Sequence, residues 1–141
     1  MKNIFIKLSA LLLVISVLCF VFVSCGDAED KTDDAEHTED TTIGQGATEF
    51  TFEVEHLNGK VVTFTVKTDK EILSDALLEN NLISGEEGQF GLYVKTVDGV
   101  TYDYKADGVY WALYVDGDYA TSGVDSQSVE NGHTYKFKAE Q

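Results

Sequence analysis

Two segments with alternating apolar and polar residues, Glu49–His56 and Val62–Val66, constrain the fold most strongly. An alternation with a period of two residues is typical of a strand that buries one face. A two-residue turn would place charged and aromatic side chains on the same face, whereas the three-residue loop Leu57–Gly59 gives a single apolar face. We therefore predict an antiparallel hairpin in which Gly59 adopts a left-handed conformation. The apolar pairs in this register are Phe50 with Val66, Phe52 with Phe64, and Val54 with Val62.

The segment after the hairpin has the pattern of one short helix. Thr68, followed three residues later by Glu71, matches a capping box, in which the two residues satisfy each other's backbone N–H groups. We predict a helix that begins with Thr68 as its N-cap and ends at Asn80-Asn81. Four apolar residues recur at helical spacing and form the stripe of a helix that packs on a core: Ile72, Leu73, Ala76 and Leu77.

The rest of the sequence indicates strands separated by Asp-Gly turns. The most apolar of them, residues 109–115, should be a central strand covered on both faces. A hairpin, one helix packed on a mixed sheet and further C-terminal strands define an α+β fold that is β-grasp-like. We assign residues 48–141 to this single domain. The other strands are expected from about Leu92 to the Asp98-Gly99 turn and over residues 100–104, 118–120 and 134–138.

The first 24 residues have the layout of a secretory signal peptide, with Lys2 and Lys7 near the start and an apolar run that ends at Cys25. A cysteine directly after the cleavage point resembles the bacterial lipobox. This resemblance implies that Cys25 carries a lipid and anchors the chain in the membrane. A different cleaved signal and an uncleaved membrane anchor stay open as alternatives. Each of the three places the following residues outside the cytoplasm, and the lipid anchor places them on the bacterial cell surface.

Residues 25–47 are predicted to form an acidic, disordered tether. Residues 26–40 hold eight acidic residues and one lysine, with no aromatic or large aliphatic side chain. Such a composition cannot bury enough apolar surface to offset the entropy of ordering. The whole chain has ten lysines, no arginine and 25 acidic residues, for a net charge of -15. We therefore expect no nucleic-acid partner, because phosphates would repel the chain.

No pattern of catalytic residues stands out. His37, His56 and His133 are scattered, without the spacing of a metal site. Removal of a signal peptide would take away Cys19, and a lipid would occupy Cys25. The Asp-Gly turns stop short of a calcium-binding loop. We expect a protein that is not an enzyme, has no metal site and requires no cofactor.

The aromatic residues between positions 110 and 119 carry the strongest indication of function. Tyr110 and Tyr114 share one face of the predicted strand, whereas Trp111 lies on the other. One helix covers only one face, so the other aromatic set would be open to a ring-bearing ligand or a sugar. The alternative, which stays open here, is ordinary packing beneath the loop of residues 121–133.

The order of several motifs resembles the transcobalamin-like C-terminal domain family. Leu73–Leu77 has the Leu-x-x-Ala-Leu pattern of an early helix, and Gly88–Val94 is a glycine-rich strand region. Tyr110–Gly117 then matches the Tyr-Trp strand. A Gly123-Val124 turn and an Asn131-Gly132 turn before the last strand complete the pattern, although His133 stands where aspartate is common. The resemblance covers about residues 50–140.

This resemblance implies a β-grasp-related ligand-binding module. It places Tyr110, Trp111, Gly123 and Val124 at the border of the ligand face. Because animal vitamin B12 carriers contain this domain, it also implies cobalamin or another corrinoid as a ligand. We therefore expect a lipid-anchored binding module for a small ligand, with Tyr114 as a further candidate ligand residue. The alternative is a structural or interaction lipoprotein that binds a protein partner at the cell surface.

Overall fold

The computed structural model describes His37 and residues 40–141. The predicted signal peptide, Cys25 and residues 26–36 of the predicted tether lie outside the described residues. Within the described part of the chain, no helix is long and apolar enough to cross a membrane.

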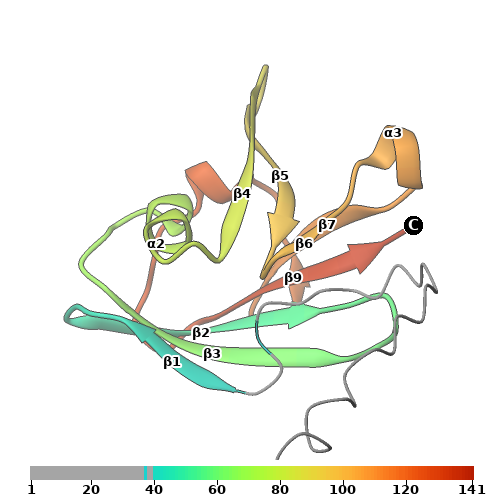
Figure 1. The fold of residues 1–141 in the computed structure, drawn as a ribbon. Helices are drawn as coiled ribbons and strands as arrows, with labels where there is room; N and C mark the ends of the chain where they lie inside the picture. Colours follow the sequence, from blue (N-terminus) through green and yellow to red (C-terminus); the bar gives the residue numbers. More distant parts are fainter. Residues whose placement is uncertain (1–36, 38–39) are drawn as a thin grey trace, which may run out of the picture. The chain divides into compact units, whose positions relative to one another are not determined.

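The main element is a mixed sheet of six strands in the order β1-β3-β2-β9-β7-β8 (Figure 1). The pairs β1–β3 and β2–β9 are parallel, and the other neighbours are antiparallel. The first hairpin and the last strand therefore lie side by side in the middle of the sheet. The strands are β1 (Thr41–Gly44), β2 (Thr48–Glu55), β3 (Val61–Thr68), β7 (Tyr110–Val115), β8 (Asp118–Tyr119) and β9 (Thr134–Glu140).

A second sheet of three strands, in the order β4-β5-β6, lies with helix α2 on one side of the main sheet (Figure 1). Its β4–β5 hairpin projects away from the main sheet. Two short helical turns lie in the later connections. The bounds are α2 (Leu73–Glu79), β4 (Ile83–Gly88), β5 (Gly91–Val97), β6 (Val100–Thr101), α3 (Tyr104–Asp107) and the 3-10 turn η1 (Val124–Ser126). The predicted α+β class is confirmed.

The predicted hairpin register is confirmed in detail. Phe52 lies opposite Phe64, and the pairs on either side of it follow the same register. The loop closes with a hydrogen bond from the Gly59 N–H to the His56 carbonyl at 2.9 Å, and Gly59 has a φ of 80°. A left-handed residue at this position is the conformation that glycine adopts at least cost.

Among the described residues, an apolar core lies between the main sheet and the elements on its covered side, and it contains side chains from both sheets, α2 and η1. The aromatic rings of Phe52, Phe64 and Phe137 meet at its centre. The Phe52 ring centroid is 5.9 Å from that of Phe64 and 6.1 Å from that of Phe137. All three side chains are buried.

The N-terminal boundary of the folded region differs from the prediction. Residues 41–44, which we placed in the disordered tether, form β1 and pair with β3 in parallel. Ile43 packs against the core. The four-residue strand was missed because its alternation is too short to stand out next to the acidic run. Its stability comes from pairing with residues more than 20 positions away.

The predicted capping box is wrong. Thr68 is the last residue of β3 and is buried opposite Thr48. Its hydroxyl accepts a hydrogen bond from the Lys70 N–H at 3.0 Å, but the helix begins only at Leu73. Ile72 takes the N-cap position with an extended backbone and without a side-chain cap. Strand pairing, which a local motif does not encode, holds Thr68 in place.

Two strand predictions need correction. Residues 100–104 do not form one strand, because β6 ends at Thr101 and Tyr104 begins α3. The Asp103 carboxylate caps α3 by accepting a hydrogen bond from the Lys105 N–H. β7, predicted to be central, lies next to the two-residue edge strand β8, because β9 enters between β2 and β7. The central strands, which pair with long strands on both edges, are β2 and β9.

Candidate functional site

The two faces of β7 have different surroundings, as the alternation predicted. Trp111 is 6% exposed, and its ring packs against the rings of His56 and Tyr102 at centroid distances of 5.9 and 5.2 Å. Tyr110 and Tyr114 lie half-buried on the opposite face. The alternation of side chains along β7 therefore places Trp111 on one face of the strand and the two tyrosines on the other.

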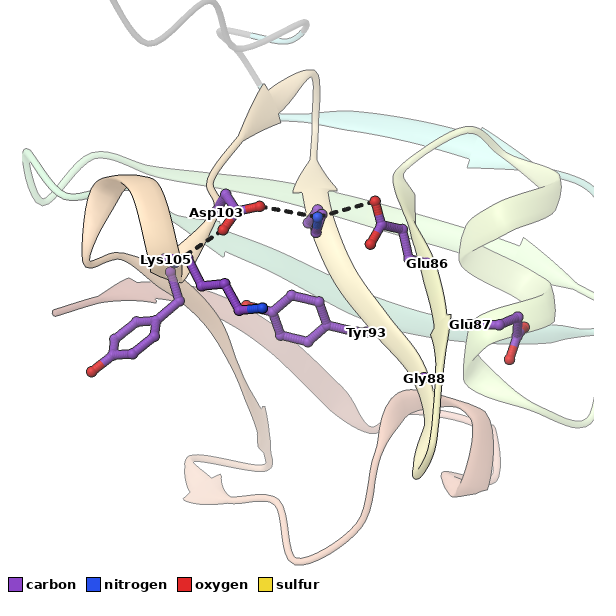
Figure 2. Close-up of a pocket in the computed structure, with 8 residues that line it drawn as sticks. Glu86, Glu87, Gly88, Tyr93, Asp103 and Lys105 are labelled. Atoms are coloured by element: carbon purple, nitrogen blue, oxygen red, sulfur yellow. Dashed lines mark hydrogen bonds and ion pairs between the residues drawn. The ribbon is translucent and has the colours of Figure 1, made fainter.

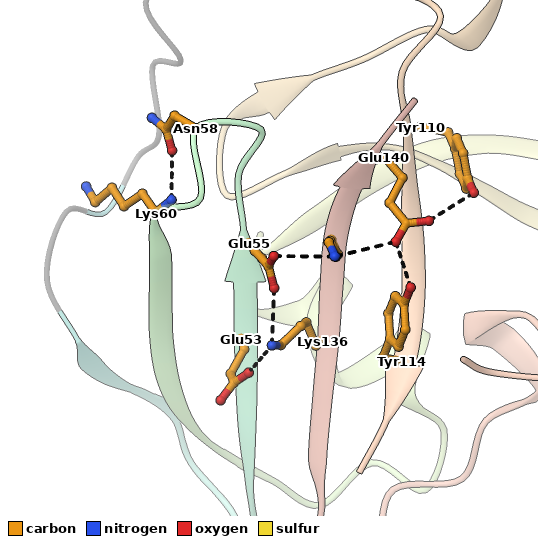
Figure 3. Close-up of polar contacts among 9 residues, drawn as sticks. Glu53, Glu55, Asn58, Lys60, Tyr110, Tyr114, Lys136 and Glu140 are labelled. Carbon is orange, nitrogen blue, oxygen red and sulfur yellow. Dashed lines mark hydrogen bonds and ion pairs between the residues drawn. The ribbon is translucent and has the colours of Figure 1, made fainter. Parts of the chain in front are cut away.

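The tyrosine face of β7 is held by Glu140 from the neighbouring strand β9 (Figure 3). The Tyr114 hydroxyl donates to the Glu140 Oε1 at 2.6 Å, and the Tyr110 hydroxyl donates to Oε2 at 3.1 Å. Because both phenols donate to a carboxylate, their neutral forms are favoured. The hydrogen bond to Glu140, with burial as the next cause, raises the pKa of Tyr110 and that of Tyr114 to about 12.

The open face of the sheet next to Glu140 carries a ladder of charges instead of an apolar strip. Lys136 lies between Glu53 at 2.9 Å and Glu55 at 3.3 Å (Figure 3). Lys138 continues the ladder, at 3.6 Å from Glu55 and 3.8 Å from Glu140. The hydrogen bond to Glu53 is the main cause that raises the pKa of Lys136. The sequence did not indicate this ladder as a unit, because its members come from both β2 and β9.

We expect the free energy of unfolding to decrease as the pH rises from about 10 toward about 12. In the unfolded chain tyrosine loses its proton near pH 10, whereas Tyr110 and Tyr114 keep theirs up to about 12 in the folded state. The folded state then binds more protons than the unfolded state, so stability falls with pH across this window. Ultraviolet absorbance of the phenolates and urea denaturation at each pH measure the two effects. Glu140→Gln should lower both tyrosine pKa values, and an unchanged titration in this variant would contradict the assignment.

Four of the five predicted ligand residues line one cleft of about 190 Å³, which we call the Trp111 cleft. These four are Tyr110, Trp111, Gly123 and Val124. The fifth, Tyr114, lies outside it and lines a separate pocket with Glu55, Lys136 and Lys138. The cleft also contains residues that the sequence analysis did not select, above all Leu92, Tyr93 and Tyr119. The sequence analysis predicted a strand from about Leu92 to the Asp98-Gly99 turn, but nothing in that segment indicated which residues β5 would meet.

The wall formed by residues 122–124 is attached to β5 through Asp125. The Asp125 Oδ2 accepts a hydrogen bond from the Leu92 N–H at 3.0 Å. Gly91 has a φ of 102°, and a Cβ atom there would lie only 2.0 Å from the same carboxylate oxygen. Glycine is therefore required at position 91 for this approach. Backbone hydrogen bonds from Leu73 to Gln127 and from Val129 to Glu71 hold the other side of the loop against the start of α2.

Two polar atoms at the cleft are buried without a hydrogen-bond partner among the described residues. They are the indole Nε1 of Trp111 and the Oδ1 of Asp125. Trp111 itself lines the cleft, and Asp125 follows directly after its wall. A buried donor or acceptor without a partner costs free energy. Neither atom recovers this free energy through a hydrogen bond to the described residues.

A larger, charged pocket of about 360 Å³, the Lys95 pocket (Figure 2), shares Tyr93 with the Trp111 cleft. The Lys95 ammonium lies 3.0 Å from both Glu86 and Asp103. The hydrogen bond to Glu86, followed by the one to Asp103, raises the pKa of Lys95. The hydrogen bond from Lys95 is the main cause that lowers the pKa of Asp103. In Figure 2, Glu86 points toward Asp103, whereas Glu87 points away from Tyr93.

The histidines lie in three separate places. His56 is buried against Trp111. His37 is 2.6 Å from the buried Asp98, and His133 lies between Asp116 at 2.7 Å and Glu130 at 3.1 Å. Across His37 and residues 40–141, no group of three or more His, Cys, Asp or Glu side chains is arranged to hold a metal ion.

Fold and site together define a small α+β module with an open, aromatic-lined cleft beside its main sheet. The chain belongs to the family described as "Domain of unknown function (DUF4430)", whose profile matches residues 70–141. The comparison with curated proteins gives no match.

Solved structures that are similar to this chain include the following two. The first is a suggested metal-binding protein from Ruminococcus gnavus ATCC 29149, with a TM-score of 0.64 and 26% identity over 67% of this chain and 98% of that one. The second is haptocorrin in complex with Cbi, with a TM-score of 0.50 and 23% identity over 67% of this chain and 25% of that one. The chain thus spans about a quarter of the length of haptocorrin. This second likeness supports a distant relationship in fold to the transcobalamin-like domains.

Proposed function

We propose that this protein is an extracytoplasmic, lipid-anchored and non-catalytic module that binds a small ring-bearing ligand in the Trp111 cleft. A corrinoid is the first ligand to test. The lipid on Cys25 would attach the module to the cell membrane, and the acidic residues after it would separate the folded part from the lipid. Mass spectrometry of the N-terminal peptide from the native protein tests the anchor, because Cys25 should carry acyl chains.

The geometry of the cleft is the observation that carries the proposal. Tyr93, Tyr110 and Tyr119 offer ring surfaces around a cavity that is already open. At the same place the buried indole N–H of Trp111 has no described partner. Binding sites for small molecules typically combine apolar walls with a few polar groups that orient the ligand. A ligand with a flat face and a hydrogen-bond acceptor at its edge fits both features.

The choice of a corrinoid rests on resemblance. The order of motifs is similar to that of the transcobalamin-like domains, and haptocorrin, a structural neighbour, was solved in complex with Cbi. The four residues that the resemblance assigns to the ligand face all line the same cleft.

We expect cobalamin to bind the purified protein and to raise its melting temperature. A ligand present at 100 times its Kd stabilises the folded state by about 2.7 kcal/mol. Equilibrium dialysis followed by visible absorbance measures binding, and thermal denaturation measures the stabilisation. Tyr119→Leu should weaken binding, because this exposed ring lines the cleft. Leu57→Ala is the control, since Leu57 is also exposed but lies in the β2–β3 loop. An equal effect of both variants, or no retention of cobalamin, would reject the corrinoid.

The alternative function, an interaction lipoprotein, is favoured by one observation. β4 is an edge strand of the three-stranded sheet, and its residues 84–88 are exposed. A partner segment could add to this edge by main-chain hydrogen bonds. Pull-down from the native cell surface distinguishes the two functions, because only this alternative predicts a protein bound in stoichiometric amount.

A further inference from the structure

Three tyrosines from three different elements line a further cavity, shallow and of about 470 Å³, which shares Tyr93 and Tyr110 with the Trp111 cleft. They are Tyr93 of β5, Tyr104 of α3 and Tyr110 of β7, and we call this cavity the tyrosine cage. Gln141 completes its lining. We propose that the tyrosine cage binds a small organic cation that carries an alkylated ammonium group, such as a trimethylammonium compound.

The rings of the cage have the arrangement that recognises such a cation. The rings of Tyr104 and Tyr110 are 6.1 Å apart between centroids and 81° apart in orientation, so they form two walls of a corner. Tyr104 is 57% exposed and Tyr93 is 42% exposed, which leaves ring surface available to a ligand. An alkylated ammonium is attracted to the negative faces of aromatic rings, while its methyl groups fill the space between them.

Both walls are held in place before any ligand binds. The hydroxyl of Tyr110 donates to Glu140, which fixes the orientation of its ring. Tyr104 begins the short helix α3, which the Asp103 side chain caps at its first turn. Asp103 is itself held by Lys95 at 3.0 Å, and its N–H donates to the Asp107 side chain at 2.9 Å. A pre-arranged cage loses less conformational entropy on binding than one that must assemble around the ligand.

Glu140 and the net charge of the chain favour a cation at the cage. The Lys95 pocket shares Tyr93 and Tyr104 with the cage. Two carboxylates compensate Lys95 there at 3.0 Å, and the Lys105 side chain extends toward Tyr93 (Figure 2), so the charges of this pocket on the side of the cage balance. Glu140 lies beside Tyr110. The net charge of the whole chain, -15, attracts cations over longer distances.

The experiment compares choline with its neutral isostere 3,3-dimethylbutanol, using NMR titration of the tyrosine ring signals of the purified protein. We expect choline to bind at least about tenfold more tightly, because only the cation gains the attraction of the ring faces. Tyr104→Leu should abolish this preference, whereas Tyr104→Phe, which keeps the ring, should retain it. Equal binding of the two compounds, or loss of the preference in Tyr104→Phe to the same extent as in Tyr104→Leu, would overturn the proposal.

Phe90→Leu is the matched control. Phe90 is an aromatic residue of the β4–β5 turn that is 93% exposed, and it lines neither the Trp111 cleft nor the cage. This variant should leave the preference for choline unchanged, and an equal loss in both leucine variants would also overturn the proposal. The two ligands test the two proposals separately. If cobalamin does not bind, the choline titration still tests the cage. If choline does not bind, the cobalamin measurement still tests the Trp111 cleft. Retention of the Cys25→Ser protein, which cannot carry the lipid, on phosphatidylcholine vesicles, lost when Tyr104→Leu is added, would assign the cation to a lipid headgroup, whereas binding of choline alone assigns it to a free compound.

Discussion

Replacing Phe52 by alanine is expected to lower the free energy of unfolding by about 3–5 kcal/mol, the usual cost of removing a fully buried phenylalanine ring. Phe52 is 0% exposed, and its ring lies between those of Phe64 and Phe137 at the centre of the core. The loss combines the transfer free energy of the ring with the cost of the cavity that it leaves. The cavity persists because the neighbouring strands of the sheet cannot move together to fill it. Urea denaturation followed by circular dichroism measures the change.

Phe90→Ala is the matched control for this prediction. Phe90 lies in the β4–β5 turn and is 93% exposed, so its removal should change the free energy of unfolding by no more than about 0.5 kcal/mol. If the two variants were destabilised equally, the position of Phe52 at the centre of the core would be wrong. If Phe52→Ala does not accumulate as a folded protein, Phe52→Leu should show a smaller loss that can be measured.

His37→Ala is expected to lower the free energy of unfolding by about 1–3 kcal/mol, although His37 lies in the acidic segment that we predicted to be a disordered tether. The carboxylate of Asp98 is 0% exposed, and the His37 ring nitrogen lies 2.6 Å from it. The His37 N–H is 3.3 Å from the second carboxylate oxygen. The His37 ring also packs edge-on against Phe64 at 5.1 Å. Removing the ring leaves a buried carboxylate without this partner.

The same substitution at His133 provides the control. His133 also pairs with carboxylates, Asp116 and Glu130, but these groups are at least half exposed. Surface pairs of this kind contribute about 0–1 kcal/mol, so His133→Ala should be close to neutral. Equal stability of His37→Ala and the wild-type protein would show that the contact with Asp98 does not fasten the N-terminal segment to the domain.

The hairpin shows how far local patterns determine the fold. The register of β2 and β3 was predictable because a shift by one residue would move every aromatic side chain to the charged face. In the same way, alternation predicted that Trp111 and Tyr110 lie on opposite faces of β7, and the structure agrees. In both cases the information lies in neighbouring residues of one segment, because side chains alternate along any strand.

The errors share another cause, which is competition from distant partners. Thr68 has the local sequence of a helix cap, yet β3 continues through it because Thr68 pairs with Thr48. The strand β1 has almost no pattern of its own and depends on β3 for its hydrogen bonds. Residues 109–115 are apolar enough for a central strand, but the position of β7 depends on where β9 enters the sheet.

The residues that border the cleft could be named from the sequence, but the cleft itself could not. The aromatic strand was found from its own aromatic residues and their alternation, and the Gly123-Val124 turn through a family resemblance. Tyr93 and Leu92 were missed because they reach the cleft through β5, which the Asp125 side chain attaches from 33 positions away in the chain. The tyrosine cage likewise brings together residues from β5, α3 and β7, which share no sequence pattern.

By itself the sequence determined the α+β class, the hairpin and its register, and the two faces of β7, because each follows from the spacing of apolar residues within short segments. Only the tertiary structure decided the strand order, the burial of Asp98 against His37, and which aromatic rings surround the cleft and the cage. These features depend on contacts between residues far apart in the chain. The free energy of such contacts is set by packing and hydrogen bonding in three dimensions, which no local pattern records.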